Sequence, residues 1–548
     1  MMMTGERSEN QQVEGLVASG VGARAAACDP GASYVLALDS GTTSVRAILF
    51  DVHGAIVAQA AQPITQYYPR PGWVEHDPRE ILARQIATIS EVQFASGIHS
   101  ERIAAVGITN QRETVVVWDR RTGEPVCNAL CWQCRRTEPL IAELRERGLA
   151  PMIAAKTGLV LDPYFSASKL AWILDNVPGA RARAERGELL FGTVDSWLIW
   201  NLTGGAAVAG GAPTGGLGAG AQGTAAPVHA TDRTNASRTM LYNIHTLSWD
   251  DELLELFGVP RAMLPRVCAS TDDYGRVSAD IMAARPPITG VAGDQQASLF
   301  GHGCFDAGQV KATYGTGCFV LMNTGAAPAA SDNGLVTTIA ATPAGAPVAY
   351  ALEGSVFNAG SVVQWLRDEM DLVRTAEETE ELALSVPDTA GVYVVPAFTG
   401  LGAPWWDAGA RGVVCGLTRG CSRAHFVRAA LESIAYQTHD VIEAMRRDFP
   451  DAGALTRLAV DGGGSVNRFT MQWQADVLGC PVERPRTSEA TALGAAYLAG
   501  LGVGFWGGLD ELRANAGEPA ARFEPAMDEA TRRERLAGWY EALRRARS

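Results

Sequence analysis

The first ordered part of the chain alternates short apolar segments with polar turns, a pattern that predicts β-strands. Apolar residues at 34–38 and 47–50 flank the turn Asp39–Ser44, with the sequence DSGTTS. This predicts a β-hairpin whose tip offers backbone N–H groups and hydroxyls. The segment does not predict a dinucleotide-binding opening, in which one strand leads directly into a helix. The other elements predicted here are strands at 56–62, 103–108 and 114–118, helices at 78–96, 140–147, 168–176 and 195–201, and an N-cap at Asp77.

The same pattern begins again near residue 290. Predicted strands at 309–313 and 315–322 lie on either side of Tyr314-Gly315, in the run TYGTG, and Asp461–Gly464 joins a strand to a helix. Strands that end in Gly-rich polar loops therefore occur in both halves, which predicts two related α/β domains with a cleft between them. The other elements predicted in this half are strands at 348–353, 392–396 and 458–460, and helices at 361–368, 425–446, 464–478 and 493–501.

Composition narrows the class of protein. A chain of 548 residues is too long for one ordinary core, so it predicts two or more domains. A net charge of −14 and a pI of about 5.2 argue against nucleic acid as a partner. We see no apolar run long enough to cross a membrane. Residues 1–33 are predicted to be a flexible tail, and the Gly/Ala-rich segment 204–227 a flexible insertion.

The ten cysteines are scattered, as expected for a protein of the reducing cytosol. Cys131 and Cys134 form a single CxxC pair. A thioredoxin-like redox pair is one interpretation, but the sequence favours buried thiols. Lysine is nearly absent, and only Lys156, Lys169 and Lys311 occur in the whole chain.

Two loops are candidates for phosphate binding. In Asp39–Ser44 and in Tyr314-Gly315-Thr316-Gly317, hydroxyls and small residues let the backbone approach an anion closely. Each loop alone could be a plain turn, but two of them at corresponding places favour a nucleotide. The chain has no GxxxxGK[ST] motif, which excludes a P-loop enzyme.

Candidate chemistry surrounds Asp294, a carboxylate that follows a predicted strand and small residues. It could act as a general base, or simply cap a predicted helix at 295–300. Arg112-Glu113 and Trp132 suit a polyol, because charged groups bind hydroxyls and an indole covers C–H groups. The alternatives are a solvated turn pair for Arg112-Glu113, and core packing for Trp132 and for two further aromatic residues, Tyr164 and Phe319.

Several long motifs together resemble the FGGY family of carbohydrate kinases, and within it the members that phosphorylate glycerol. They include GITNQRET, WQCRR, TNASRTML, GDQQASLFG and TYGTGCF, and the resemblance extends from about residue 34 to 506. It implies an α/β fold of two actin-like (ribonuclease-H-like) ATPase domains flanking a central cleft. The implied domains are 34–301, with the glycerol pocket and first phosphate loop, and 302–548, which binds the nucleotide.

The resemblance also assigns residues by their matching positions. Asp294 is implied to be the catalytic base, and Asp39 the acid associated with Mg²⁺. The implied glycerol-binding residues are Arg112, Glu113, Trp132, Tyr164, Asp294, Gln295 and Phe319. The implied nucleotide contacts are Thr42, Thr43, Ser44, Arg46, Thr316, Gly360, Gln364, Gly463 and Asn467. Ser40 departs from the family, which usually carries Gln there.

The activity implied is the ATP-dependent phosphorylation of glycerol to glycerol 3-phosphate, with Mg²⁺, in the cytoplasm. The expected partners are glycerol and ATP, without nucleic acid or membrane insertion, in a homodimer or homotetramer. Two alternatives stay open. One is a pentulose or other polyol as acceptor, and the other is a weakly active paralogue that binds a metabolite or protein, to which Ser40 alone points.

Overall fold

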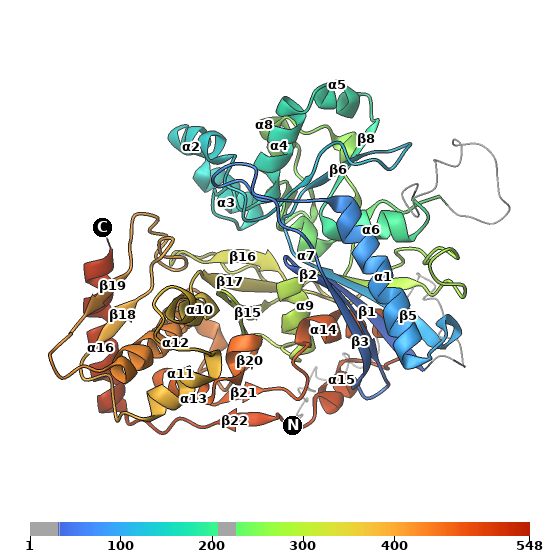
Figure 1. Ribbon diagram of the computed structural model, residues 1–548. Coiled ribbons are helices and arrows are strands. Elements are labelled where there is room, and N and C mark those ends of the chain that lie inside the picture. The colour runs from blue at the N-terminus through green and yellow to red at the C-terminus, as the bar shows by residue number, and fades with distance from the viewer. Residues whose placement is uncertain (1–30, 32, 206–225, 548) are drawn as a thin grey trace, which may run out of the picture.

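The computed structural model describes residue 31, residues 33–205 and residues 226–547. The predicted tail at 1–33 and the predicted insertion at 204–227 lie outside this part of the chain except at their edges. Two β-sheets organise the described residues, one in each half (Figure 1).

The first sheet has five strands in the order β13-β5-β1-β2-β3. β1 and β2 form the predicted hairpin and pair antiparallel, as do β2 and β3, whereas β5 is parallel to β1 and β13 is parallel to β5. The strands are β1 (Tyr34–Ser40), β2 (Ser44–Phe50), β3 (Ile56–Pro63), β5 (Ile103–Asn110) and β13 (Ile288–Gly293).

The second sheet repeats this order. Its seven strands run β16-β17-β15-β14-β20-β21-β22, and the five from β17 to β21 match the first sheet in order and direction. The strands are β14 (Val310–Tyr314), β15 (Cys318–Gly325), β16 (Val336–Ile339), β17 (Tyr350–Val356), β20 (Leu458–Asp461), β21 (Val482–Arg484) and β22 (Ala521–Phe523). The repeat confirms the predicted pair of related α/β units.

Alternation along β1 assigns its side chains to two cores. Leu36 and Leu38 pack with Ile81 of helix α1 (Pro78–Ser96), whereas Val35 and Ala37 on the other face pack with residues of α14 (Ala490–Val503). Successive side chains of a strand point to opposite faces, so a helix from the second half covers one face of the first sheet.

The helices α9 (Asp294–Gly301) and α14 cross between the two sheets (Figure 1). A Cβ at Gly494 would lie 1.8 Å from the Ala297 carbonyl oxygen, and one at Gly301 would lie 2.0 Å from that of Ala490. Only glycine permits such a close approach. In turn, Leu299 of α9 packs with residues of the second sheet. Helix α14 of the second half thus packs on the first sheet, and helix α9 of the first half packs on the second sheet.

The predicted strand at 315–322 begins too early, because Gly315 donates its N–H to the Gly317 carbonyl (2.8 Å) and closes a turn. Helices predicted at 425–446 and 493–501 are longer at both ends in the structure.

The remaining main helices are α2 (Glu138–Glu146), α3 (Ala150–Thr157), α4 (Ser166–Asn176), α5 (Ala180–Glu185), α6 (Val194–Leu202), α7 (Arg233–Ala236), α8 (Asp251–Phe257), α10 (Gly360–Asp368), α11 (Ala376–Leu384), α12 (Arg423–Asp448), α13 (Arg468–Leu478), α15 (Leu509–Ala516) and α16 (Glu529–Ala546). The shorter strands are β4 (Glu75–His76), β6 (Val116–Asp119), β7 (Ala129–Leu130), β8 (Leu189–Gly192), β9 (Ala230–Asp232), β10 (Tyr242–Asn243), β11 (Ser248–Trp249), β12 (Arg266–Cys268), β18 (Tyr393–Val395) and β19 (Val413–Cys415).

Within the described ranges, no helix has both the length and the apolar character that crossing a membrane requires. Cys131 and Cys134 are free and fully buried, which confirms that the CxxC pair is one of buried thiols. Burial raises the pKa of Cys131 to about 11, so its thiol is not poised for exchange.

Candidate active site

The turn after β5 places Arg112 and Glu113 between the halves. Both side chains are almost fully buried, so the predicted alternative of a solvated turn pair is wrong. Glu113 has a φ of 62°, a left-handed conformation that non-glycine residues rarely adopt. Such strain persists where the surrounding structure enforces it, as at ligand sites.

The catalytic candidate Asp294 is the first residue of α9, directly after β13. The N-cap is Gly293, whose backbone is extended, so the capping alternative for Asp294 is wrong. Its Oδ1 instead accepts the N–H of the next residue, Gln295 (2.7 Å). This bond holds the Asp294 carboxylate at the start of α9.

Arg112 and Asp294 form an ion pair with 3.1 Å between Nε and Oδ1. The Arg112 side chain is only 2% exposed, whereas that of Asp294 is 30% exposed, so a substrate can still reach the carboxylate. Gly293 makes room for this contact, because a Cβ there would lie 2.7 Å from Cγ and Cδ of Arg112.

The three aromatic residues that the resemblance assigns to glycerol binding form one partly buried cluster beside these charges. The ring centroids of Trp132 and Tyr164 are 5.4 Å apart, and those of Trp132 and Phe319 are 6.4 Å apart, all in edge-to-face geometry. Trp132 and Tyr164 come from the first half, and Phe319 lies on β15 of the second sheet. An apolar wall therefore spans the two halves opposite the buried charges.

The first candidate phosphate loop is the tight turn between β1 and β2, closed by the Gly41 N–H and the Ser44 carbonyl (3.0 Å). Thr43 at its tip is exposed, and the Thr42 hydroxyl accepts the indole N–H of Trp132 (3.0 Å). This bond joins the loop to the aromatic cluster. The Ser40 side chain is fully buried, and its hydroxyl has no hydrogen-bond partner among the described residues.

Arg46 and Asp39 sit opposite each other on β2 and β1. Arg46 forms an ion pair with Glu489 (2.6 Å), the residue before α14, so its cation has a protein partner. Burial raises the pKa of Asp39 to about 7 against the opposing effect of Arg46, and the nearby Asp294 carboxylate adds to the rise.

Asp39 and Asp294 suit a hard divalent cation. The Asp39 side chain has no hydrogen bond or ion pair among the described residues, which leaves its carboxylate oxygens available. No cluster of three or more His, Cys, Asp and Glu side chains suited to a metal occurs in the described ranges. Mg²⁺ does not need one, because it commonly binds one or two carboxylates with water and phosphate oxygens.

The second candidate loop, between β14 and β15, is in close backbone contact with the first residue of α10. Gly360 donates its N–H to the Gly315 carbonyl (2.9 Å), and a Cβ on Gly360 would lie 2.5 Å from that oxygen. Thr316, Gln364 and Gly463 are exposed at this end of the second sheet. A Cβ at Gly463 would meet nothing within 4 Å, so this backbone faces open space.

Asn467 has structural partners at the same end of the second sheet. Its Oδ1 caps α13 by accepting the Thr470 N–H (2.9 Å), and its Nδ2 donates to the Thr379 hydroxyl (3.2 Å). The exposed predicted contacts and Asn467 therefore lie around one group of strand ends.

Comparison with known proteins gives the family. The model of the N-terminal domain of the FGGY family of carbohydrate kinases matches residues 34–301, and that of the C-terminal domain matches residues 310–503. The chain belongs to the FGGY family of carbohydrate kinases. It is 57% identical to a glycerol kinase of Symbiobacterium thermophilum over 94% of this chain and 98% of that protein. It is 55% identical to glycerol kinase 2 of Thermotoga maritima, with the same coverage of both chains.

Solved structures agree with this assignment. A glycerol kinase of Plasmodium falciparum, solved with ADP, has a TM-score of 0.85 and 35% identity, covering 94% of this FGGY chain and 99% of that one. A xylulose kinase of Lactobacillus acidophilus shares the fold, with a TM-score of 0.81 at 23% identity over 94% and 98% of the two chains. The predicted actin-like fold is therefore confirmed.

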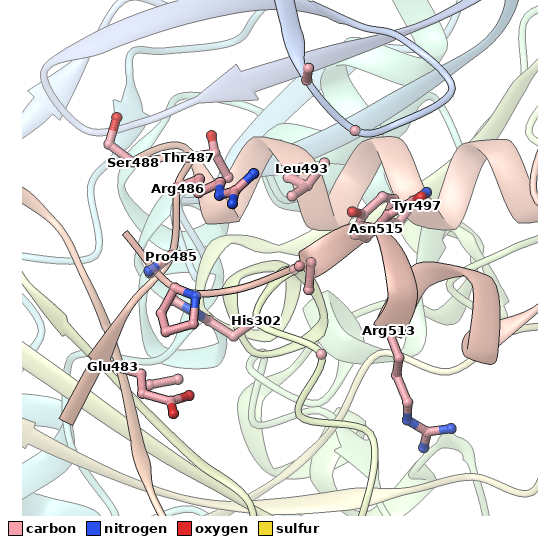
Figure 2. Close-up of a pocket in the computed structure, with 18 of the residues that line it drawn as sticks. His302, Glu483, Pro485, Arg486, Thr487, Ser488, Leu493, Tyr497, Arg513 and Asn515 are labelled. Atoms are coloured by element: carbon pink, nitrogen blue, oxygen red, sulfur yellow. The ribbon is translucent and has the colours of Figure 1, made fainter. Parts of the chain in front are cut away.

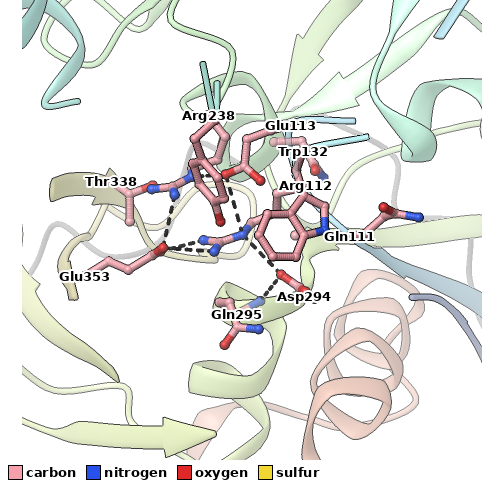
Figure 3. Close-up of polar contacts among 12 residues, drawn as sticks. Gln111, Arg112, Glu113, Trp132, Arg238, Asp294, Gln295, Thr338 and Glu353 are labelled. Carbon is pink, nitrogen blue, oxygen red and sulfur yellow. Dashed lines mark hydrogen bonds and ion pairs between the residues drawn. The ribbon is translucent and has the colours of Figure 1, made fainter. Parts of the chain in front are cut away.

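The candidate site also contains charged residues whose role the sequence did not predict. Glu353 on β17 accepts hydrogen bonds from Arg112 and Arg238, and Arg238 Nε donates to Glu113 (2.6 Å), as Figure 3 shows. Lys311 on β14 donates to the Gln295 side-chain oxygen (2.5 Å). Arg238 lies within a motif of the resemblance, TNASRTML, but no local pattern marks Glu353, which reads as an ordinary strand residue.

A separate cavity of about 670 Å³ lies at the other end of the interface between the halves (Figure 2). His53 and Gly54 from the β2–β3 turn, Tyr497 of α14 and Arg513 of α15 line it, among other residues. None of the predicted site residues lines this cavity. This cavity is therefore distinct from the candidate site, which combines the buried charges with the exposed glycine loops.

Proposed function

We propose that this FGGY kinase transfers the terminal phosphoryl group of ATP to glycerol, giving glycerol 3-phosphate and ADP. The observation that carries the proposal is the juxtaposition of Asp294, Arg112 and the Trp132 cluster, together with the family relationship. Charged groups that bind hydroxyls face an aromatic wall that suits the C–H groups of a small polyol.

In this proposal Asp294 accepts the proton of the attacking hydroxyl. Its partly exposed carboxylate is close enough to Asp39, which precedes the first phosphate loop, to raise the pKa of that residue. The Trp132 indole in turn connects the aromatic wall to Thr42 of the loop. Phosphoryl transfer needs the acceptor in line with the phosphate and donors for its equatorial oxygens. Backbone N–H groups and hydroxyls of Thr42, Thr43 and Ser44 would supply such donors.

ATP is proposed to bind at the exposed strand ends of the second sheet. Thr316, Gln364 and Gly463 are accessible there, and Gly463 leaves its backbone free for close approach. Asp39, with Asp294 beside it, would hold Mg²⁺, which neutralises the developing phosphate charge. The proposed partners follow as glycerol and Mg²⁺-bound ATP.

The acceptor size follows from the aromatic wall. Trp132, Tyr164 and Phe319 crowd the site from both halves, which favours a three-carbon polyol over a pentulose. A coupled ADP-release assay with glycerol, xylulose, ribulose, gluconate and no acceptor tests both reaction and substrate. We expect release with glycerol alone. Release with a pentulose would refute the acceptor, and no acceptor-dependent release would refute the reaction.

A further inference from the structure

Four charged side chains around the proposed glycerol site are removed from water. Arg112 and Arg238 are 2% and 1% exposed, and Glu113 and Glu353 are 1% and 0% exposed. Desolvating four charges is costly, and mutual pairing often fails to repay it as stability. Such a cluster is better explained by what it positions than by the stability it adds.

Glu353 makes the strongest contacts in this cluster. Its Oε2 accepts from Arg112 Nη1 (2.5 Å) and its Oε1 from Arg112 Nη2 (2.9 Å). Oε1 also accepts from Arg238 Nη2 (3.0 Å). A bidentate carboxylate–guanidinium pair fixes the plane of the arginine. With that plane fixed, the Nε edge of Arg112 lies against Asp294, as Figure 3 shows.

Lys311 fixes the side chain of Gln295, the residue after Asp294, in a similar way. It is fully buried, and its Nζ donates to Gln295 Oε1 (2.5 Å) and to the Thr313 hydroxyl (2.9 Å). Because the lysine holds the amide oxygen, the Gln295 Nε2 is turned away from it. That nitrogen has no hydrogen-bond acceptor among the described residues, so it is free to donate to a ligand.

The choice of lysine here runs against the composition of the chain. Lys311 is one of three lysines among 46 basic residues. An ammonium is a compact point charge, whereas a guanidinium is a wide planar fork. At this position one compact ammonium reaches both Gln295 and Thr313.

We propose that Glu353 and Lys311 are positioning residues that orient Arg112 and Gln295 for binding the acceptor hydroxyls. The inference rests on the proposed glycerol phosphorylation and deepens it. Both residues belong to the second sheet, while Arg112 and Gln295 belong to the first half. The acceptor site is therefore complete only when the second sheet is in place against the first half.

The test compares steady-state kinetics of the full chain and two variants. Glu353→Gln keeps the shape but removes the charge, and Lys311→Met removes the ammonium. We expect each to raise the KM for glycerol at least tenfold, with the KM for ATP and the glycerol-independent ATP hydrolysis within twofold of the parent chain. Matched controls are Glu443→Gln and Lys156→Met, whose ion pairs with Arg446 and with Asp250 and Glu252 involve none of the proposed site residues.

A merely structural role predicts something different. It would lower the melting temperature and impair both substrates together, and that result would overturn the proposal. So would a folded Glu353→Gln with an unchanged KM for glycerol. If Glu353→Gln does not fold, Glu353→Asp keeps the charge but shortens the reach, and glycerol affinity within twofold of the parent chain would refute the need for the bidentate contact.

The activity of the parent chain distinguishes a failure of the positioning role from a failure of the proposed function. Glycerol-dependent ADP release by the parent chain, with unaffected variants, would overturn the positioning role alone. Absence of glycerol-dependent release by the parent chain would overturn the proposed function and the positioning role with it.

Discussion

The two sheets share one strand order but differ in what their strand ends carry. In the first half, Asp39 is the last residue but one of β1, the turn after β5 holds Arg112 and Glu113, and Asp294 follows β13. At the corresponding places of the second half, glycine turns follow β14 and β20. One scaffold thus presents charged side chains in one copy and bare backbone in the other.

The copies also differ in exposure. Arg112 and Glu113 are buried and ion-paired, whereas Thr316 and Gly463 are exposed, and Gly463 has open space beside its backbone. A small polyol needs a few fixed hydrogen-bonding groups, while a nucleotide needs room for its phosphates and base. This difference supports an acceptor site built around the buried charges of the first half, which the second sheet completes, and a nucleotide site at the open strand ends of the second half.

Replacing the acid of the first half should have the largest effect. Asp294→Asn removes the proposed base but keeps its size, and a positioned base contributes about 10²–10⁴-fold. We expect kcat to fall by that range, while ADP binding measured by calorimetry persists. A variant within a few-fold of the parent chain would remove Asp294 from this role.

Asp39 should control the pH dependence of the reaction. Its pKa is raised to about 7 by burial, with Asp294 adding to the rise, so below pH 7 it is increasingly protonated and cannot bind Mg²⁺. We expect kcat/KM for ATP to be roughly tenfold lower at pH 6 than on the plateau. Because Mg²⁺ competes with the proton, raising its concentration should move this limb to lower pH.

A stability measurement provides a second check on Asp39. A carboxyl whose pKa is raised in the folded state destabilises the fold as the pH rises from about 4 to about 7, because the unfolded chain loses that proton more readily. Asp39→Asn should therefore melt at a higher temperature than the parent chain at pH 8, and similarly at pH 4. Equal melting temperatures at pH 8 would contradict the raised pKa.

Two adjacent glycines distinguish packing from ligand contact in the second half. A Cβ at Gly462 would lie 2.5 Å from the Tyr314 carbonyl oxygen, and the residue has a φ of 82°. Gly462→Ala should therefore destabilise the fold by about 1–3 kcal/mol, measured by denaturant unfolding. Gly463→Ala is its matched partner, and it should leave stability unchanged but raise the KM for ATP several-fold.

The opposite pattern for the two glycines would mean that Gly462, not Gly463, faces the nucleotide. An unchanged KM for ATP in both variants would place the nucleotide away from this loop. In either case the KM for glycerol serves as the internal reference, since the acceptor residues come from other strand ends.

The smallest effect is expected at the contact between acceptor wall and phosphate loop. Trp132→Phe retains an aromatic ring but loses the N–H that donates to Thr42. A neutral hydrogen bond contributes about 1 kcal/mol net, so we expect kcat/KM to fall about fivefold. Thr42→Val removes the acceptor instead, and the double variant should add little if this one bond is responsible.

The sequence reveals features that short-range chemistry determines. The hairpin at Asp39–Ser44 and the turn at Gly315–Gly317 follow from glycine and hydroxyl residues within a few positions. Long helices such as α12 follow from apolar spacing, although their ends shift by a few residues. The resemblance then grouped Arg112, Trp132 and Asp294, which no local pattern could bring together.

The sequence does not predict ion pairs between residues that are far apart in the chain. Arg112 and Glu353 are 241 positions apart, and a lone glutamate in an apolar strand carries no sign of its partner. The resemblance implies that Arg46 contacts the phosphate. Its ion pair with Glu489 is an additional contact, which depends on how α14 packs against the first sheet. These contacts arise from the packing of the halves, which a one-dimensional pattern does not encode.

The crossed helices α9 and α14 have a consequence for biosynthesis. The strands of the first sheet are all made by residue 293, but the helix that covers one face is not made until residue 503. At about 5–20 residues per second, the ribosome leaves this face bare for on the order of ten seconds or longer. The nascent first half therefore waits, apolar side exposed, for a segment still to be translated, and a fragment ending at residue 301 should be retained by chaperones.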